Sequence, residues 1–441
     1  MGSSGRLQVR LGLIAVASPL EVGAEWAPEL LRAAGTALAS AQGVHLVTGG
    51  VVDRAAAARE AGVVFRREAV DAVVAVAASW FEDYLVADAL EEWHVPAILW
   101  AVPGMETGSL CGQQQAAFLL SQLGWPCRLV FAPVRSAVAL TELLPYARAA
   151  ALWQRLRRAR IGLIGHRVLG MTETAADELS LRRQLGPRVI HLDVSELAAE
   201  AGKVPEEDAC RVWEKARAEV GSVRCHEQDG IESCRMFLAL QELVQRLELS
   251  ALAVGCYPHL MGKVCVAASM LGEQGVPVAC EGDVNGAVAM LVLALLSGEP
   301  VHNTDMLDPL PEENAIVFSH CGSGAFSLAS DRQEIVLAPV RLMRRGVCCL
   351  FPARPGEVTL VNLVAGTGGY LFGVLHGEAL STQMVFPGNP LKVRFGSPYE
   401  RIVEWVVQQG LGHHWMAAYG DHRAELRFLA RLCGCRLVEI C

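Results

Sequence analysis

Residues 72–78 read Ala-Val-Val-Ala-Val-Ala-Ala, an unbroken apolar run. Such a run is typical of a strand buried on both faces, as in a parallel sheet covered by helices. Similar runs lie at Val9–Ala17, His45–Thr48, Pro96–Val102 and Arg128–Pro133, and helical patterns lie at Ala24–Ala41 and Phe81–Glu92. This alternation of strands and helices predicts a parallel, doubly wound α/β domain.

The same alternation restarts near residue 160, after a long helical stretch at 136–159. Strands are predicted at 161–164, 189–192, 251–257 and 276–281, with helices at 205–219, 231–247 and 261–271. Two consecutive blocks of this kind imply two doubly wound domains. Ligands of such domains bind at the carboxyl ends of the strands.

The last third of the chain changes character after Pro300. Short β-rich runs with Gly and Pro between them indicate an antiparallel sheet or a small barrel. These runs lie at 315–319, 334–340, 347–351, 358–364, 369–375 and 391–395, and two helices at 399–408 and 423–432 follow. We therefore predict an α/β protein with two tandem Rossmann-like domains, 1–158 and 159–299, and a β-rich C-terminal domain, 300–441.

Charge and hydropathy exclude two classes of partner. The chain has 38 Lys and Arg against 47 Asp and Glu, a net charge of −9, so no nucleic-acid partner is expected. Its longest apolar block, Ala287–Leu296, is far shorter than the ~20 residues of a membrane-spanning helix. The run at Leu11–Ala17 is too short for a secretory signal, and residues 1–5 are expected to form a flexible leader. We expect a cytoplasmic protein without membrane contact.

The 14 cysteines show no metal-binding spacing, because the sequence contains no Cys-x-x-Cys. Several of them, such as Cys265 and Cys280, lie inside apolar runs, where a free thiol behaves as a small hydrophobe. Free thiols fit the reducing cytoplasm. The spacing also disfavours a zinc site with thiolate ligands.

The strongest local pattern is Val-Pro-Val-Ala-Cys-Glu-Gly-Asp-Val-Asn-Gly at 276–286. A buried strand ends here at Glu281, and a helix begins near Asn285. Asp283 fits the N-cap of that helix, which is a structural role. Capping does not account for Glu281, because it lies on the strand side of the turn, where parallel sheets bind ligands.

Asp305 follows the same helix, in Val-His-Asn-Thr-Asp at 301–305, at the junction between the second and third domains. Asn-Thr-Asp is also good turn chemistry, so a turn is the structural alternative. The sequence alone does not decide between a turn and a second functional acid.

Four histidines are candidates for the same site. His320 lies in Ser-His-Cys-Gly-Ser-Gly at 319–324, where glycines allow close approach of a ligand. His413 and His414 follow Gly-Leu-Gly, and a histidine pair there is hard to explain by packing. His259 follows a predicted strand end and is a weaker candidate.

Two carboxylates with one or two histidines suit a divalent cation. Carboxylates favour Mn²⁺ or Mg²⁺, and an imidazole favours Mn²⁺ or another transition ion such as Co²⁺. Such an ion could polarise neighbouring hydroxyl and carbonyl oxygens while a carboxylate moves a proton between adjacent carbons.

At these residues the chain resembles the L-fucose and L-arabinose isomerase family. The resemblance rests on Cys-Glu-Gly-Asp-Val-Asn-Gly at 280–286, Asp305, Ser-His-Cys-Gly-Ser-Gly at 319–324 and Gly-His-His at 412–414. The position of His320 matches a histidine of the arabinose-type members. Leu110–Gly112 and Ile161–Met171 are also similar to family segments, so the likeness covers most of the chain.

The resemblance implies a Mn²⁺-dependent aldose–ketose isomerase acting on a monosaccharide and assembled as a homotrimer or homohexamer. It implies that Glu281 and Asp305 bind the ion and move a proton through an enediol. His414 would be the third metal ligand, and His320 and His413 would be additional ligands or substrate contacts. The first domain of a neighbouring subunit would complete the pocket.

Two other functions remain open. Tandem α/β domains also describe non-catalytic sugar-binding or regulatory relatives, whose ligand lies between two lobes. That function requires no metal and no convergence of Glu281, Asp305 and His414. A nucleotide-dependent oxidoreductase is the other alternative, but Gly-Leu-Ile-Gly at 162–165 is not a Gly-x-Gly-x-x-Gly loop.

Overall fold

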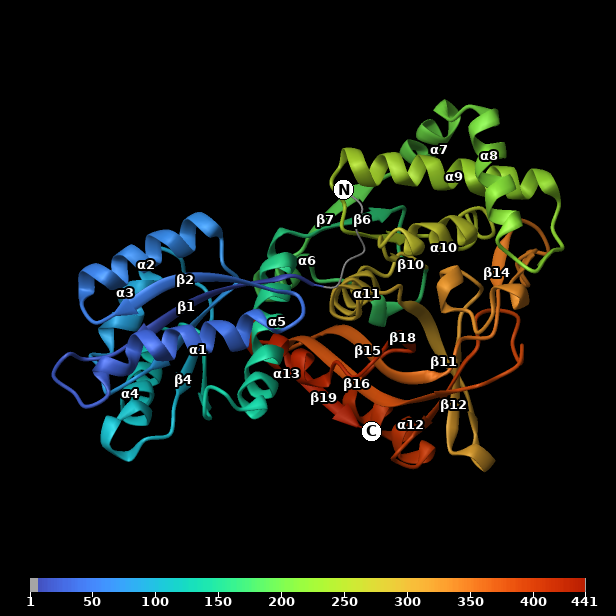
Figure 1. The fold of residues 1–441 in the computed structure, drawn as a ribbon. Coiled ribbons are helices and arrows are strands. Elements are labelled where there is room, and N and C mark those ends of the chain that lie inside the picture. Colours follow the sequence, from blue (N-terminus) through green and yellow to red (C-terminus); the bar gives the residue numbers. More distant parts are fainter. Residues whose placement is uncertain (1–6, 441) are drawn as a thin grey trace. The chain divides into compact units, whose positions relative to one another are not determined.

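The structure, a computed structural model, describes residues 7–440 (Figure 1). The leader expected at residues 1–5 lies outside the described residues. The described chain forms two compact units. The N-terminal unit comprises residues 7–155 and 424–432, and the C-terminal unit comprises 156–423 and 433–440. The division into three domains stays a prediction.

The N-terminal unit is built on a five-stranded, all-parallel sheet with strand order β2-β1-β3-β4-β5. Its strands are β1 (Val9–Val16), β2 (Val44–Val52), β3 (Ala72–Ala77), β4 (Ala97–Ala101) and β5 (Cys127–Phe131). Its helices are α1 (Ala27–Ala39), α2 (Ala55–Glu68), α3 (Tyr84–Glu91), α4 (Ser109–Gln122) and α5 (Ala137–Arg158).

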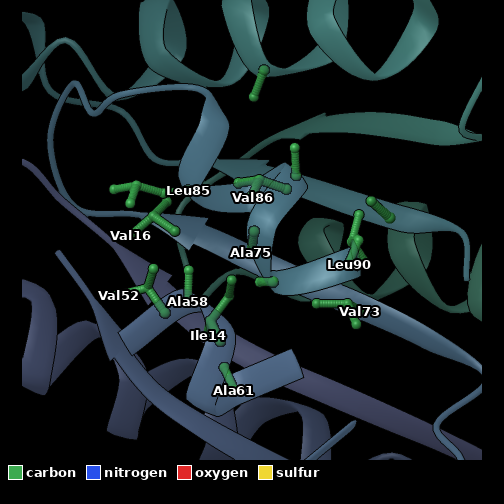
Figure 2. Packing of buried hydrophobic residues seen from close by; sticks show 14 of the residues in the cluster. Ile14, Val16, Val52, Ala58, Ala61, Val73, Ala75, Leu85, Val86 and Leu90 are labelled. Atoms are coloured by element: carbon green, nitrogen blue, oxygen red, sulfur yellow. The ribbon is translucent and has the colours of Figure 1, made fainter. Parts of the chain in front are cut away.

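The apolar run at 72–78 is the centre of this sheet. Every residue of β3 is at most 1% exposed. Figure 2 shows Ala75 of β3 in one cluster with Ile14 of β1 and with Leu85 and Val86 of α3. Burial on both faces explains why this strand shows no alternation of polar and apolar residues.

Helix α13 (Arg423–Cys433) returns late in the chain to the N-terminal unit. Phe428 packs edge-on against Tyr146 of α5, with ring centroids 5.4 Å apart. Arg148 forms an ion pair with Glu425, at an N–O distance of 3.3 Å. The strand and helix alternation does not predict this return, because nothing in a local pattern encodes a contact across nearly 300 residues of chain.

The C-terminal unit begins with a four-stranded parallel sheet of order β10-β9-β6-β7. Its strands are β6 (Arg160–Ile164), β7 (Arg188–Leu192), β9 (Ala251–Val254) and β10 (Val278–Ala279). Its helices are α6 (Glu178–Gln184), α7 (Val194–Lys203), α8 (Glu206–Ala218), α9 (Glu227–Arg246), α10 (Cys265–Glu273) and α11 (Val284–Ser297). Strands β9 and β10 end earlier than predicted, because the chain leaves the sheet before Tyr257 and Glu281.

The C-terminal unit also contains a closed antiparallel barrel. Six strands pair in the ring β15-β18-β11-β12-β17-β16, and β15 pairs with β16 to close it. Strand β19 adds in parallel to β16. The strands are β11 (His302–Leu310), β12 (Ala315–Ser319), β15 (Gly356–Gly366), β16 (Gly369–Leu380), β17 (Leu391–Phe395), β18 (His414–Tyr419) and β19 (Arg436–Ile440), and α12 (Tyr399–Gln409) lies between β17 and β18.

The turn considered at 301–305 is wrong. Residues 302–310 form β11, whose backbone is paired with β12 on one side and β18 on the other. These two partners satisfy the backbone groups that turn chemistry would otherwise satisfy locally, so tertiary pairing overrides the local preference. A third, small sheet joins β8 (Ser222–Val223), β13 (Val336–Ala338) and β14 (Cys348–Leu350).

Helix α11 connects the parallel sheet to the barrel. It packs against β9 of the parallel sheet. It also packs against β15 and β18 of the barrel (Figure 1). Its residues 284–293 are all buried, which explains the longest apolar block of the sequence. None of the described helices has the length and apolar character needed to cross a membrane. The predicted α/β class, with two parallel sheets followed by an antiparallel barrel, is confirmed.

Candidate active site

Glu281 lies on a sharp turn between β10 and α11. Its φ of 63° and the φ of 71° at Gly282 place two consecutive residues in the left-handed region. A Cβ at residue 282 would meet the carbonyl oxygen of His166 at 2.7 Å, so this turn requires glycine there. Val168 donates its backbone N–H to the Glu281 carbonyl at 3.2 Å. The strained conformation of Glu281 is typical of residues whose side chain has a function.

Asp305 and His414 are brought together by the register of the barrel. In the antiparallel pair β11–β18, Asp305 lies directly opposite His414. In the pair β11–β12, Asp305 lies opposite Ser319, the residue before His320. Directly opposed residues have Cβ atoms about 5 Å apart. The barrel therefore places this acid between the two histidines.

Four of the predicted site residues converge on one point. Nε2 of His414 is 3.1 Å from Oε2 of Glu281 and 3.5 Å from Oδ1 of Asp305. Nε2 of His320 is 3.6 Å from Oε2 of Glu281 and 3.9 Å from Oδ1 of Asp305. The two histidines are buried, whereas the side chains of Glu281 and Asp305 are 21% and 24% exposed. The cluster therefore opens to solvent on its carboxylate side.

Asp283 has two roles. As predicted, it caps α11, since its Oδ1 accepts the backbone N–H of Gly286 at 2.8 Å. Its second oxygen, Oδ2, lies 2.9 Å from Nδ1 of His414. Sequence reasoning missed this contact, although the Glu-x-Asp spacing at 281–283 was a signal that both acids leave the same turn.

His413 does not share the environment of His414. Its Nδ1 is 2.7 Å from Oε1 of Glu173, and its side chain is 44% exposed. The rings of His413 and His414 are 4.3 Å apart at their centroids, so His413 lies at the rim of the cluster. Glu173 is a residue of the loop after β6 that sequence reasoning missed, because no local motif marks it.

His259 is exposed on the loop after β9. The groups of potential ligand atoms found among residues 7–440 include Glu281, Asp305, His320, His413 and His414 but not His259. The structure therefore brings five of the six predicted residues together and leaves His259 outside the cluster.

The charges of the cluster stabilise one another. Burial would raise the pKa of Glu281, but the facing His320 and His414 outweigh it and hold that pKa below its usual range. Burial would lower the pKa of His414, but its contacts with Asp283 and Glu281 raise that pKa to about 9. Without a bound ion, His414 is therefore a cation held between carboxylates.

The donor atoms fit a divalent metal ion. Ligands at about 2.1 Å from an ion, at right angles, lie about 3 Å from one another, close to the separations found here. Oδ1 of Asp305 is buried and has no hydrogen-bond partner among the described residues. The nearest positive group to this oxygen among the described residues is the protonated His414, 3.5 Å away, and a bound cation in direct contact would stabilise the oxygen further. Oxygen and imidazole donors suit Mn²⁺ better than a soft ion.

Several curated proteins similar to this chain are named sulfoquinovose isomerases. It is 27% identical to a sulfoquinovose isomerase of Alkalicoccus urumqiensis over 381 residues, which cover 84% of this chain and 86% of that protein. It is 25% identical to the sulfoquinovose isomerase of Priestia megaterium, covering 82% and 84%. The corresponding protein of a Clostridium species is 27% identical, covering 76% and 78%. No protein-family model matches the chain.

These similarities confirm the predicted class, an enzyme that interconverts an aldose and a ketose. The likeness to L-fucose and L-arabinose isomerases in particular stays a prediction. A solved ABC-transporter solute-binding protein of Burkholderia multivorans covers 66% of this chain and 95% of its own at 12% identity, with a TM-score of 0.19. A likeness at that score carries no argument.

Proposed function

We propose that this chain is a Mn²⁺-dependent isomerase of a sulfonated aldose, acting by proton transfer through an enediol. The observation that supports the proposal is that carboxylate oxygens of Glu281 and Asp305 both lie within 3.5 Å of Nε2 of His414, although the three residues come from separate parts of the chain. Side chains so far apart in sequence do not meet in this way to cap a helix or fill a core.

Glu281, Asp305 and His414 would hold the ion, and His320 would be a fourth ligand or a contact to the sugar. Mg²⁺ and Co²⁺ are alternatives to Mn²⁺ for this donor set. When bound, the ion would polarise two neighbouring sugar oxygens and so acidify the intervening C–H bond. The other steps depend on the protein's own carboxylates.

Proton transfer is assigned to the two partly exposed acids. One of them removes the proton on C2 of the open-chain aldose, and the electron pair forms the enediol. The other acid carries the hydroxyl proton of O2 to O1, and return of the first proton to C1 then leaves a hydroxyl group on C1 and a carbonyl at C2. Both contacts of Glu281 with histidine use Oε2, and its Oε1 has no hydrogen bond within the described part of the chain. That oxygen is our candidate base.

The choice of substrate is supported by the relatives rather than by the site. Sulfoquinovose is a 6-deoxyglucose with a sulfonate on C6, so its C1 and C2 carry the aldose group that the mechanism requires. A sugar of this class is our proposed substrate. His413, fixed by Glu173 at the rim, is proposed to contact its hydroxyl groups. A homotrimer or homohexamer and a cytoplasmic location remain part of the proposal.

The non-catalytic sugar-binding alternative leaves the cluster without a purpose. A binding protein needs hydrogen bonds to the sugar but no set of carboxylates and histidines arranged as ligands of an ion. The two functions therefore differ in what they require of Glu281.

The test is ketose formation followed by ¹³C NMR, with metal-free protein, Mn²⁺ and a panel of sulfoquinovose, L-fucose and L-arabinose. We expect conversion of sulfoquinovose only when Mn²⁺ is present. Glu281→Gln should reduce the rate by at least about a hundredfold, which is the lower bound for loss of general acid–base catalysis.

The matched control is Glu173→Gln, which removes a carboxylate that faces His413 and not the proposed ion. It should keep most of the Mn²⁺ dependence. Normal turnover by Glu281→Gln would exclude this residue as the base. Sugar binding without ketose formation from any of the three sugars would favour the non-catalytic alternative.

A further inference from the structure

A group of thiols lies directly behind the candidate active site. Cys280, His320 and Cys321 each offer a ligand atom, and these three atoms lie within 4.8 Å of one another. Cys256 adjoins Cys280, and Cys265 adjoins Cys321. All four thiols belong to the C-terminal unit, and none is in a disulfide. We call Cys280, His320 and Cys321 the thiol cluster.

The thiol cluster is distinct from the carboxylate site but shares His320 with it. Nε2 of His320 faces Glu281 and Asp305, whereas Nδ1 lies 3.1 Å from Sγ of Cys321. The two nitrogens of this imidazole therefore point to two different sets of donors. Cys280 and Cys321 are also the chain neighbours of Glu281 and His320.

The donors of the thiol cluster are soft, unlike those of the carboxylate site. Two thiolates and an imidazole match tetrahedral sites for zinc-type ions, with metal–sulfur distances of about 2.3 Å and metal–nitrogen distances of about 2.0 Å. Ligand atoms around such an ion lie about 3.3–3.8 Å apart, within the limit found for the cluster. Cys256 and Cys265 stand next to the three donors as candidates for the fourth position.

We propose that the thiol cluster is a second metal site, which takes a thiophilic ion of the Zn²⁺ or Cd²⁺ class through Cys280, Cys321 and Nδ1 of His320. Sequence spacing disfavours such a site, because no two of its cysteines belong to a metal-binding motif. The fold creates it instead, by bringing the end of β10 next to the end of β12.

Occupancy of this site has a consequence for the proposed isomerase. An ion on Nδ1 of His320 fixes the ring and pulls it toward Cys321, away from Glu281 and Asp305. We therefore expect thiophilic ions to inhibit the enzyme without competing for the carboxylate ligands. This consequence, unlike the binding site itself, rests on the proposed function.

The binding test uses Cd²⁺ as the probe. Metal-free, reduced protein is titrated with Cd²⁺, and the ultraviolet charge-transfer band of Cd²⁺–thiolate bonds is recorded. Carboxylate and imidazole ligands do not give this band, so occupancy of the carboxylate site does not contribute. We expect a band that saturates at about one equivalent and loses most of its intensity in Cys321→Ser and in Cys280→Ser.

The matched control is Cys111→Ser, an exposed thiol of the N-terminal unit, which should leave the band unchanged. If Cys280→Ser does not fold, Cys321→Ser alone decides, because serine preserves a hydrogen-bonding group beside His320. A band of equal intensity in wild type and Cys321→Ser, or no band with stoichiometric Cd²⁺, would overturn the proposal.

The inhibition test is independent of the binding test. With Mn²⁺ present, inhibition by Zn²⁺ is measured for each protein relative to its own uninhibited rate. The Zn²⁺ concentration that halves ketose formation should be at least tenfold higher for Cys321→Ser than for wild type. Failure of the proposed function would abolish this activity readout and leave the Cd²⁺ band intact. Equal inhibition of both proteins would show that Zn²⁺ acts elsewhere.

Discussion

Asp283 holds two elements at once: Oδ1 caps the first turn of α11, and Oδ2 lies 2.9 Å from Nδ1 of His414 on β18. This contact fixes the orientation of the His414 ring and directs Nε2 toward Glu281 and Asp305. Carboxylate partners of this kind are common behind metal-ligating histidines and raise their basicity. The helix cap is therefore also the residue that orients the imidazole.

Asp283→Asn separates these two roles. The amide oxygen preserves the cap, so the midpoint of thermal unfolding without metal should change little. The lost negative charge should weaken Mn²⁺ binding by about 10- to 100-fold, measured by titration calorimetry. Asp283→Ala is the comparison, because it also removes the cap and should cost about 1 kcal/mol more in unfolding free energy. Unchanged Mn²⁺ affinity in Asp283→Asn would contradict the orienting role.

Binding of Mn²⁺ should become tighter as pH rises through neutrality. His414 has a pKa of about 9 without metal, so at lower pH an ion must displace its proton. Affinity should increase by about tenfold per pH unit between about pH 7 and about pH 8 and level off above the pKa. Calorimetry in buffers of different ionisation enthalpy measures the released proton. Asp283→Asn, which lowers the pKa of His414, should flatten this slope, and a pH-independent affinity of the wild type would contradict the assignment.

The burial of His302 predicts that the folded barrel loses stability in acid. It is 1% exposed in β11, and burial, helped by the nearby Arg354, lowers its pKa from 6.5 to about 3. The folded state thus binds fewer protons than the unfolded state, and stability is lost as pH falls below about 6.5. At pH 5 the loss is roughly 2 kcal/mol.

Urea unfolding at pH 7 and pH 5 measures this effect. His302→Leu should narrow the difference between the two midpoints, because it removes the group that titrates. His45→Gln, at an exposed histidine of β2, should preserve the wild-type difference. An equal decrease of the difference between the two urea midpoints in His302→Leu and His45→Gln would contradict a specific effect of His302.

Substitution of His413 should weaken binding of the sugar but not binding of Mn²⁺. In His413→Asn a hydrogen bond to the substrate is lost, and we expect KM for the active sugar to rise by roughly threefold to tenfold. Mn²⁺ affinity should stay within about threefold of wild type, since Nδ1 of His413 faces Glu173 rather than the carboxylate site. A large loss of Mn²⁺ affinity would instead make His413 a metal ligand.

Much of the fold could be predicted from the sequence, because parallel strands buried on both faces leave continuous apolar runs. The run at 72–78 and the strand at 315–319 are examples with correct bounds to within one residue. Strand β11 could not be predicted, because its Asn-Thr-Asp has turn chemistry and its pairing partners come from distant parts of the chain. Local patterns report local preferences, and the barrel is made of non-local contacts.

Some residues of the candidate site could likewise be predicted from the sequence, and others could not. Glu281 could be predicted because an acid at the end of a buried strand has no structural purpose. The contact of Asp283 with His414 could not be predicted, since helix capping already explained why an acid occupies position 283. Glu173 and the thiol cluster carry no motif at all. They become visible only when the loop after β6 and the ends of β10 and β12 are placed in space.

Closure of the barrel constrains how such a site can evolve. Asp305 faces His414 because β11 is held in register from both sides, and a slip of one residue would turn Asp305 to the opposite face. The distance between the side chains of Asp305 and His414 is thus set by the backbone hydrogen bonds between the strands, and the pairing can shift only by whole residues. Descendants can exchange surface loops and acquire new sugar preferences while the inner geometry passes unchanged from one enzyme to the next.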